Sequence, residues 1–180
     1  MKMNEWEIAG HTLEYLDDIH TYLVDGVVVP SVTQLISDPG KYANVPPEVL
    51  EKARKRGTEI HEAIERYVKT GEGDPLINDF VLLQAQEGFD TIGSEIPVII
   101  FRDEKPYAAG RLDLLISNES GIGIADIKTT SKLDKPYLLK QLNLYRKGFE
   151  QCYQMEITQL YAIHLRDGAK MVKIEMEDIL

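Results

Sequence analysis

The sequence predicts an α/β domain in which a mixed central β-sheet is flanked by helices and preceded by an N-terminal β-hairpin. Two patterns support this prediction. Apolar residues recur at helical spacing in three segments, and shorter segments between and after them are continuously apolar or alternate with period two. Helices interleaved with strands in this order favour helices packed against a sheet with parallel and antiparallel neighbours.

The first 45 residues are predicted to form a hairpin followed by a short helix. Residues 11–29 alternate apolar and polar side chains around Asp25-Gly26, a pair favoured in two-residue turns. Ser31 is a good helix-capping residue, and a helix that starts there would run to Ile36, before a Pro-Gly pair.

The remaining predicted elements form a core over residues 47–176. The segment from Pro47 to Lys69 has an apolar helical stripe that Gly57 interrupts, so it is one helix or a broken pair. The other elements are helices over 78–92 and 136–153, strands over 96–101, 107–117 and 122–128 with a polar turn at 102–105, and a closing hairpin of 157–165 and 170–176 that turns at Asp167-Gly168.

Length and composition favour one domain without a disulfide. The 180 residues are enough for an ordinary core, and no linker or repeat divides them. Cys152 is the only cysteine, which excludes an internal disulfide and an iron-sulfur cluster held by several thiolates. No apolar segment is long enough to span a membrane, and the first residues lack a signal-peptide pattern, so we expect a cytoplasmic protein.

The charge is unevenly distributed along the chain. A formal net charge of −10 argues by itself against nucleic acid, because phosphate binding relies on Lys and Arg. Residues 52–56 nevertheless hold four basic side chains and no acid, and residues 127–149 hold six basic side chains against Asp134 alone. Such runs are more often solvated surface, but these two would also suit a phosphate backbone.

The most informative segment is the predicted hairpin of residues 110–130. A turn at residues 119–120 places Asp113 directly opposite Asp126, with Lys128 on the same face as Asp126. Like charges side by side destabilise a sheet, and a divalent cation would compensate them. Hard oxygen ligands suit Mg²⁺ or Mn²⁺. The alternative is a surface hairpin whose polar residues face solvent.

The same register predicts that both faces of the hairpin are apolar over most of their length. Charges are then expected only at one end of the second face. The predicted neighbours are Leu112 with Ile127, Leu114 with Ala125 and Ile116 with Gly123 on the first face, and Leu115 with Ile124 on the second.

Four short motifs resemble the PD-(D/E)XK nuclease superfamily, and most closely its RecB-like and phage-exonuclease branch. They are Gly57-Thr-Glu-Ile-His61, Gly110-Arg-Leu-Asp113, Asp126-Ile-Lys128-Thr129-Thr130 and Gln141-Leu-Asn-Leu-Tyr145, in the family's order. The resemblance covers roughly residues 57–145. It implies that residues 1–180 form one nuclease domain with a restriction-endonuclease-like core.

The resemblance implies a role for each matched residue. Asp113 and Asp126 would ligate one or two Mg²⁺ or Mn²⁺ ions, with His61 as a further ligand and the Ile127 carbonyl joining them. Lys128 would act on the attacking water, either as a general base or only as an electrostatic stabiliser. Asp126 departs from the glutamate that is commoner at this position in the family.

Two of the implied roles have structural alternatives. Glu95, at the start of the strand predicted over 96–101, occupies a place where this branch often has a glutamate, but a strand-end surface carboxylate is an equally good interpretation. His61 lies on a helical stripe with Gly57, so the imidazole should face the sheet, where it could also be a buried histidine bonded to backbone.

The candidate DNA contacts come from the second half of the motif region and from the basic runs. Gln141 and Tyr145 share one helix face, where they would bind a phosphate or support the metal site, unless Tyr145 belongs to the core stripe. The basic candidates are Arg54, Arg56, Lys132 and Lys140.

The function implied is metal-dependent hydrolysis of DNA phosphodiesters, preferably by an exonuclease acting on ends in phage-type or recombination and repair processing. The alternatives are a catalytically inactive nuclease-fold module that binds nucleic acid or protein, and a structure-specific endonuclease. The chain has no phosphate-loop motif, so a helicase would be a separate partner, as would a recombinase or single-strand-binding protein. A homo-oligomer is also compatible with the sequence.

Overall fold

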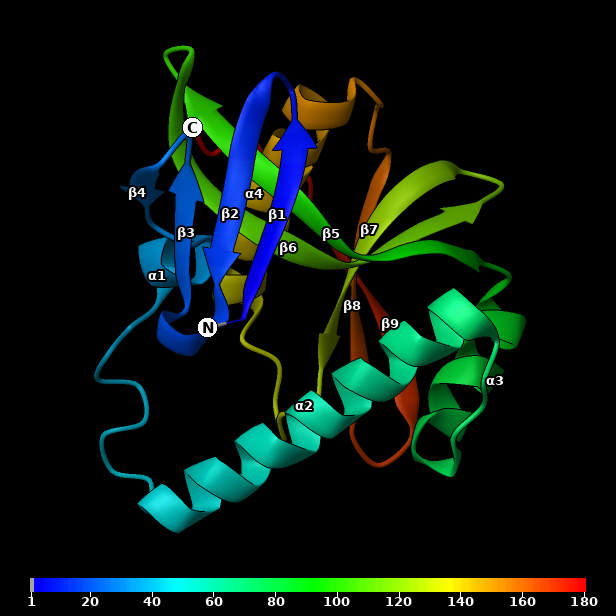
Figure 1. Cartoon of the computed structure of the whole chain (residues 1–180). Coiled ribbons are helices and arrows are strands. Elements are labelled where there is room, and N and C mark those ends of the chain that lie inside the picture. Colours follow the sequence, from blue (N-terminus) through cyan, green and yellow to red (C-terminus); the bar gives the residue numbers. More distant parts are fainter. Residues whose placement is uncertain (1) are drawn as a thin grey trace.

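The computed structural model describes residues 2–180, and its first part is a four-stranded antiparallel sheet in the order β1-β2-β3-β4 (Figure 1). The predicted turn at Asp25-Gly26 is confirmed, because Val24 pairs with Val27 across it. A single hairpin over 11–29 was too simple, since this range holds three strands and a further strand precedes it. The elements are β1 Met3–Ile8, β2 His11–Leu16, the 3₁₀ turn η1 Asp17–Ile19, β3 Thr21–Val24 and β4 Val27–Val29.

The second sheet has five strands in the order β5-β6-β7-β8-β9. β7 and β8 are parallel and the other neighbours are antiparallel, so the predicted mixed sheet is confirmed. The strands are β5 Asp90–Arg102, β6 Lys105–Asn118, β7 Gly121–Lys128, β8 Gln159–Leu165 and β9 Ala169–Ile174.

The helices are α1 Val32–Ile36, α2 Pro47–Thr70, the 3₁₀ turn η2 Pro75–Ile77, α3 Asn78–Glu87 and α4 Lys135–Tyr153. Ser31 caps α1 through a reciprocal capping box with Gln34, as its sequence predicted. α2 runs through Gly57 without a break. Within residues 2–180, no helix combines the length and apolar character needed to cross a membrane.

One predicted boundary was wrong. The helix expected over 78–92 ends at Glu87, because Gly88 adopts the left-handed conformation (φ 67°) and its amide closes the last turn on the Gln84 carbonyl. The following strand therefore begins at Asp90 and not at Ile96.

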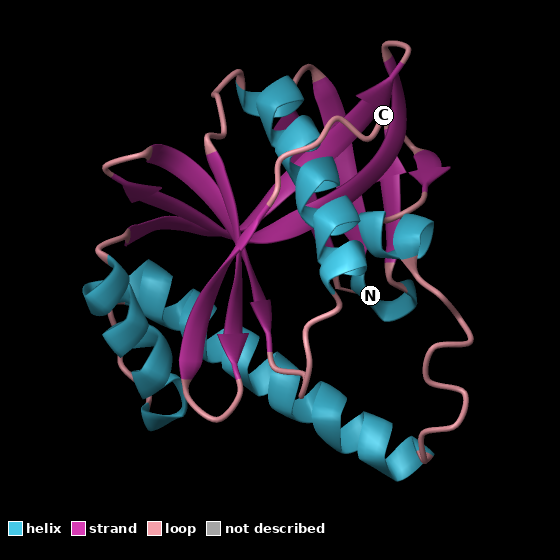
Figure 2. Ribbon diagram, turned by 180° about the vertical axis from the view of Figure 1, so that it is seen from behind, coloured by secondary structure: helices cyan, strands magenta, loops and turns pink. Residues whose placement is uncertain are grey.

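Helices cover both faces of the five-stranded sheet. α4 lies on one face, and α2 and α3 lie on the other, where the N-terminal sheet covers β5 and β6 (Figures 1 and 2). Gly148 lets α4 approach β5 closely, since a Cβ at this position would lie 3.3 Å from the Ile99 carbonyl oxygen and 2.9 Å from Ile100 Cγ1. The helix that follows the parallel strand is thus seated directly on the sheet.

The predicted register of the β6–β7 hairpin is confirmed from Leu114–Ala125 to Asn118–Gly121. The pairing stops at Leu114, one residue before Asp113, so the ladder does not include the predicted pair of Asp113 with Asp126. The predicted pairing of Leu112 with Ile127 was wrong: Leu112 packs with the α4 cluster, whereas Ile127 packs with the α2–α3 cluster. The two strands separate at Asp113, so the simple alternation of faces does not continue beyond it.

Candidate functional site

The side chain of Asp113 meets α2 at the point where β6 and β7 separate. His61 Nε2 lies 3.1 Å from Asp113 Oδ2, and the Ile127 amide donates to the same oxygen at 2.8 Å. The side chains of Asp113 and His61 are 16% and 31% exposed. The prediction that His61 faces the sheet is therefore confirmed, and the carboxylate is its direct neighbour.

The other ring nitrogen of His61 is held by its own helix. Nδ1 lies 2.8 Å from the Gly57 carbonyl oxygen, one turn earlier. A proton on Nδ1 satisfies this carbonyl, and in the neutral ring the lone pair of Nε2 then points toward Asp113. Two acceptors that face each other need a proton or a cation between them.

Gly57 also allows α2 to lie close to the end of β7. A Cβ on this residue would be 3.3 Å from Thr129 Oγ1, which is tighter than ordinary contact. This close approach brings the His61 turn of α2 to the carboxyl end of β7.

Asp126 and Lys128 alternate on β7 and so point to the same side of the strand. Lys128 Nζ lies 2.7 Å from Asp126 Oδ2 and donates to Gln141 Oε1 at 3.1 Å. Asp126 is only 2% exposed. Its Oδ2 forms the ion pair without hydrogen-bond geometry and is otherwise a buried acceptor with no hydrogen-bond partner.

The two carboxyl groups have opposite pKa shifts. Burial and the charge of Asp113 raise the pKa of Asp126 to about 6, although Lys128 opposes the shift. Burial alone would raise the pKa of Asp113 too, but the charge and hydrogen bond of His61, with Lys128 and the Ile127 amide, lower it. As pH rises, Asp113 therefore ionises before Asp126.

Both cationic partners are stabilised in their charged forms. Burial tends to lower the pKa of His61, but the charge and hydrogen bond of Asp113 outweigh it and raise the pKa to about 9. Burial likewise opposes the charge on Lys128, and Asp126 and Asp113 together raise its pKa above the ordinary value. Lys128 is therefore an ammonium at neutral pH.

Glu95 lies beside this group in an unusual backbone conformation. Its φ of 50° is left-handed, which is rare for a non-glycine residue and interrupts the β5–β6 pairing between Ser94–Leu114 and Ile96–Leu112. Burial and the charge of Asp113 raise the pKa of Glu95 to about 7, against the opposing charge of Arg111.

The expectation that Glu95 begins a strand was wrong. The strand begins five residues earlier, and Glu95 lies within it with a side chain that is 25% exposed. The alternative of a strand-end surface carboxylate therefore does not describe its position. Arg111 Nε lies 3.8 Å from Glu95 Oε2, and the Arg111 guanidinium lies 4.8 Å from the Tyr15 ring centre and 6.0 Å from the Trp6 ring centre.

Whether a divalent cation fits depends on the carboxylate oxygens of Asp113, Asp126 and Glu95 and on His61 Nε2. As the side chains lie, no group of three or more His, Cys, Asp or Glu side chains in residues 2–180 is arranged to hold a metal ion. The donor types nevertheless suit Mg²⁺ or Mn²⁺, and Oδ2 of buried Asp126 has the Lys128 ammonium beside it but no hydrogen-bond donor. The Ile127 carbonyl as a ligand stays a prediction.

Gln141 and Tyr145 come from α4 and are each 6% exposed. Gln141 holds Lys128, so it supports the group around the carboxylates. Tyr145 packs in the α4 cluster, and a Cβ on Gly110 would lie 2.9 Å from its Cε1. The core interpretation therefore describes Tyr145, and contact of either side chain with DNA stays a prediction.

The basic residues predicted to contact DNA are on the surface. Arg54 and Arg56 are exposed on the first half of α2, and Lys132 and Lys140 are exposed near and on α4. Arg54 Nη2 bonds Glu51 Oε2 at 2.6 Å, an exposed pair that contributes little to stability.

Sequence patterns alone missed a second set of contacts around Lys128. Its Nζ lies 5.6 Å from the ring centre of Tyr137, and Lys41 Nζ lies 5.4 Å from the same ring. Lys41 also pairs with Asp134 at 2.5 Å. Lys41 and Asp134 are 93 residues apart, so no local pattern joins them, although Asp134 is recognisable as a cap one residue before α4.

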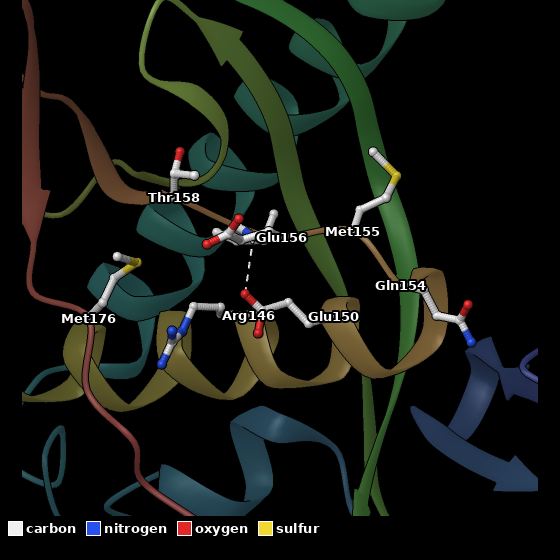
Figure 3. Close-up of a pocket in the computed structure, with 8 residues that line it drawn as sticks. Arg146, Glu150, Gln154, Met155, Glu156, Thr158 and Met176 are labelled. Atoms are coloured by element: carbon white, nitrogen blue, oxygen red, sulfur yellow. Dashed lines mark hydrogen bonds between the residues drawn. The ribbon is translucent and has the colours of Figure 1, made fainter.

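A hollow in the surface lies elsewhere. It has a volume of about 620 Å³ and lies between the end of α4 and the segment leading into β8 (Figure 3). Glu150 Oε1 there accepts the Ile157 amide at 3.1 Å. The hollow is at the amino end of β8, roughly 15 Å along the sheet from Lys128, so it is separate from the carboxylate group.

Comparisons with known proteins add little to this description. No protein-family model matches the sequence, and a search of curated proteins found no match. Among solved structures, the chain is similar to SSO0001, known from a crystal structure, with 16% identity over 84% of this chain and 68% of that chain and a TM-score of 0.48. A similarity at this level carries no argument about function.

Proposed function

We propose that this protein is a metal-dependent deoxyribonuclease with a PD-(D/E)XK-type core, and that it acts as an exonuclease on DNA ends. The observation that carries the proposal is the group of Asp113, Asp126 and Lys128 at the end of β7, where two carboxyl groups with opposite pKa shifts, one of them buried, lie beside an ammonium. Perturbed carboxyl groups of this kind are typical of functional sites.

Asp113 and Asp126 would hold the divalent cation, with His61 Nε2, Glu95 and the Ile127 carbonyl as further candidate donors. When bound, Mg²⁺ or Mn²⁺ polarises a phosphoryl oxygen and makes a bound water more acidic. Because the Gly57 carbonyl holds Nδ1 and Nε2 faces Asp113, His61 would only have to lose its Nε2 proton to act as a ligand.

Lys128 would stabilise the negative charge that develops on the scissile phosphate and orient the attacking water. Its raised pKa supports this electrostatic role over that of a general base, which would require a lowered pKa. Gln141, on α4, positions the ammonium by accepting a hydrogen bond from it. The proton of the attacking water would then be taken by solvent or by the phosphate.

The strained backbone of Glu95 supports the same proposal. A left-handed glutamate within a strand costs stability, and such outliers concentrate at functional sites. Glu95 lies between the Ser94–Leu114 and Ile96–Leu112 pairs, where it would offer the cation a third carboxylate beside Asp113.

Digestion of linear DNA in the presence of Mn²⁺ tests the proposal. We expect wild-type protein to degrade linear duplex or single-stranded DNA and to leave covalently closed circles intact. Lys128→Ala and Asp126→Asn should each lose activity by a factor of about 100 or more. Lys173→Ala, which removes an exposed lysine from β9, is the matched control and should remain active.

Three outcomes would change the assignment. Inactive wild-type protein, or active Lys128 and Asp126 variants, would contradict the nuclease proposal and leave a nuclease-fold binding module as the alternative. Cleavage of closed circles would identify an endonuclease. The proposed partners are a recombinase, a single-strand-binding protein or a separate helicase. We also propose a cytoplasmic protein, in which a homo-oligomer is one proposed state.

A further inference from the structure

The segment from residue 37 to residue 57, here called the arm, extends from the body of the protein. It comprises the connection after α1 and the first half of α2, whose first buried residue is Ile60. Both views show the start of α2 reaching beyond the sheet (Figures 1 and 2). Since the arm contributes no buried side chain to the core, packing does not explain its sequence.

One cluster connects the arm to the proposed active site. Lys41 Nζ pairs with Asp134 at 2.5 Å and lies 5.5 Å from the ring centre of Tyr42 and 5.4 Å from that of Tyr137. Lys128 Nζ lies 5.6 Å from the same Tyr137 ring. A continuous series of contacts therefore leads from the exposed Tyr42 ring to the ammonium beside Asp126.

The charge of this region is opposite to that of the whole protein. The arm has five basic and three acidic side chains, and residues 129–140 have three basic side chains and one acid. Each segment is thus positive by two charges in a chain whose formal net charge is −10. This local positive charge favours a polyanion as the ligand of the arm.

The exposed ring of Tyr42 favours single-stranded over duplex nucleic acid as this polyanion. Its side chain is 48% exposed, and Val49 is the other large apolar side chain of the arm that is freely exposed. Two such residues are too few for an apolar protein interface. A tyrosine next to a lysine is the combination that stacks an unpaired base and binds its phosphate, whereas in a duplex the base faces are already covered by neighbouring bases.

We propose that Tyr42 and Lys41 form a subsite for an unpaired nucleotide of a single-stranded DNA end, with a base stacked on Tyr42 and a phosphate at Lys41. This inference rests on the proposed nuclease function and names its substrate class. Asp134 pairs with the Lys41 ammonium, and Tyr137 lies between Lys41 and Lys128.

Binding measured without metal tests the subsite independently of hydrolysis. Fluorescence anisotropy in EDTA would compare a short labelled single strand with a blunt duplex of the same sequence. We expect wild-type protein to prefer the single strand. Tyr42→Ala should weaken that binding about tenfold and Tyr42→Phe should retain it, because the ring and not the hydroxyl stacks.

Lys41→Gln should also weaken single-strand binding and reduce its dependence on salt. Tyr107→Ala is the matched control: it removes another tyrosine ring that lies under a cation, here Arg102 at 5.5 Å on the β5–β6 hairpin, and should leave binding unchanged. Circular dichroism of each variant would verify folding.

Equal binding of the single strand by wild type and Tyr42→Ala would overturn the inference, as would a wild-type preference for the duplex. Sedimentation showing that Tyr42→Ala separates a dimer would also overturn it, because the arm would then be an interface between copies. Selective binding by a protein that does not digest DNA with Mn²⁺ would instead contradict only the nuclease function.

Discussion

Asp126 is the residue whose environment is least compatible with an ordinary structural role. It is almost fully buried, one oxygen lacks a hydrogen bond, and burial together with the neighbouring Asp113 raises its pKa to about 6. A carboxyl group with a raised pKa destabilises the fold when it is ionised. Ionised Asp126 therefore lowers the stability of the fold, and its presence calls for a functional explanation.

Removing this charge should stabilise the metal-free protein while it removes activity. Asp126→Asn imitates the neutral form that the raised pKa favours, so we expect the free energy of unfolding at about pH 8 to rise by about 1–3 kcal/mol. Urea denaturation would measure it, with the exposed Asp90→Asn as a control near zero. A destabilised Asp126→Asn protein would show that the carboxylate serves the fold through Lys128.

The titration of three neighbouring groups predicts how stability depends on pH. The pKa values of Glu95, Asp126 and His61 in the folded protein, about 7, about 6 and about 9, are all raised above their ordinary values. The native state therefore binds more protons than the unfolded state, and stability must fall as pH increases.

Denaturation midpoints of the metal-free protein should accordingly decrease from about pH 4 to about pH 9. The two carboxyl groups account for the lower part of this range. The contribution of His61 is complete below its ordinary pKa and is lost as pH rises through about 9. His61→Gln should flatten the upper part only, and a stability that rises with pH across this window would contradict the assigned environments.

At the scale of elements, α4 supports Lys128 from the face of the sheet opposite to α2. Gln141 lies on this helix, and Gly148 sets the distance between the helix and β5. A side chain at Gly148 would meet Val98 at 3.2 Å and the backbone of Ile99, neither of which is the flexible end of a side chain.

Gly148→Ala should therefore lower the free energy of unfolding by about 1–3 kcal/mol, because overpacking outweighs the better helix propensity of alanine. Thermal or urea denaturation would detect it. Gly73→Ala is the matched control, since nothing lies within 4 Å of a Cβ there, and it should be neutral. An unchanged Gly148→Ala protein would mean that α4 shifts freely on the sheet.

Local patterns were sufficient for most elements and for the hairpin register. Alternation and turn chemistry predicted the pairing of Leu114 with Ala125, because one slipped residue would expose an apolar face. They were insufficient at Asp113, where the pairing ends and Leu112 joins the cluster opposite to the one predicted. The left-handed conformation of Glu95 has no local signal, since glutamate does not favour it.

At the scale of the whole molecule, the informative contacts join distant segments. Asp113 meets His61 across 52 residues, and Lys41 meets Asp134 across 93. The first was predicted because family-like motifs marked both partners, whereas nothing in the sequence marked the second. The distribution of charge is also a property of the whole molecule, because a basic arm extends from an acidic protein.

The central claim is that Asp113 and Asp126 hold a divalent cation, and anomalous diffraction from a crystal soaked in Mn²⁺ would test it most directly. We expect a manganese peak about 2.0–2.3 Å from an oxygen of each carboxylate, with His61 Nε2 released from Asp113 to face the ion. A crystal of Asp126→Asn should show no peak. Manganese absent from the wild-type site, or bound only at other carboxylates, would contradict the claim.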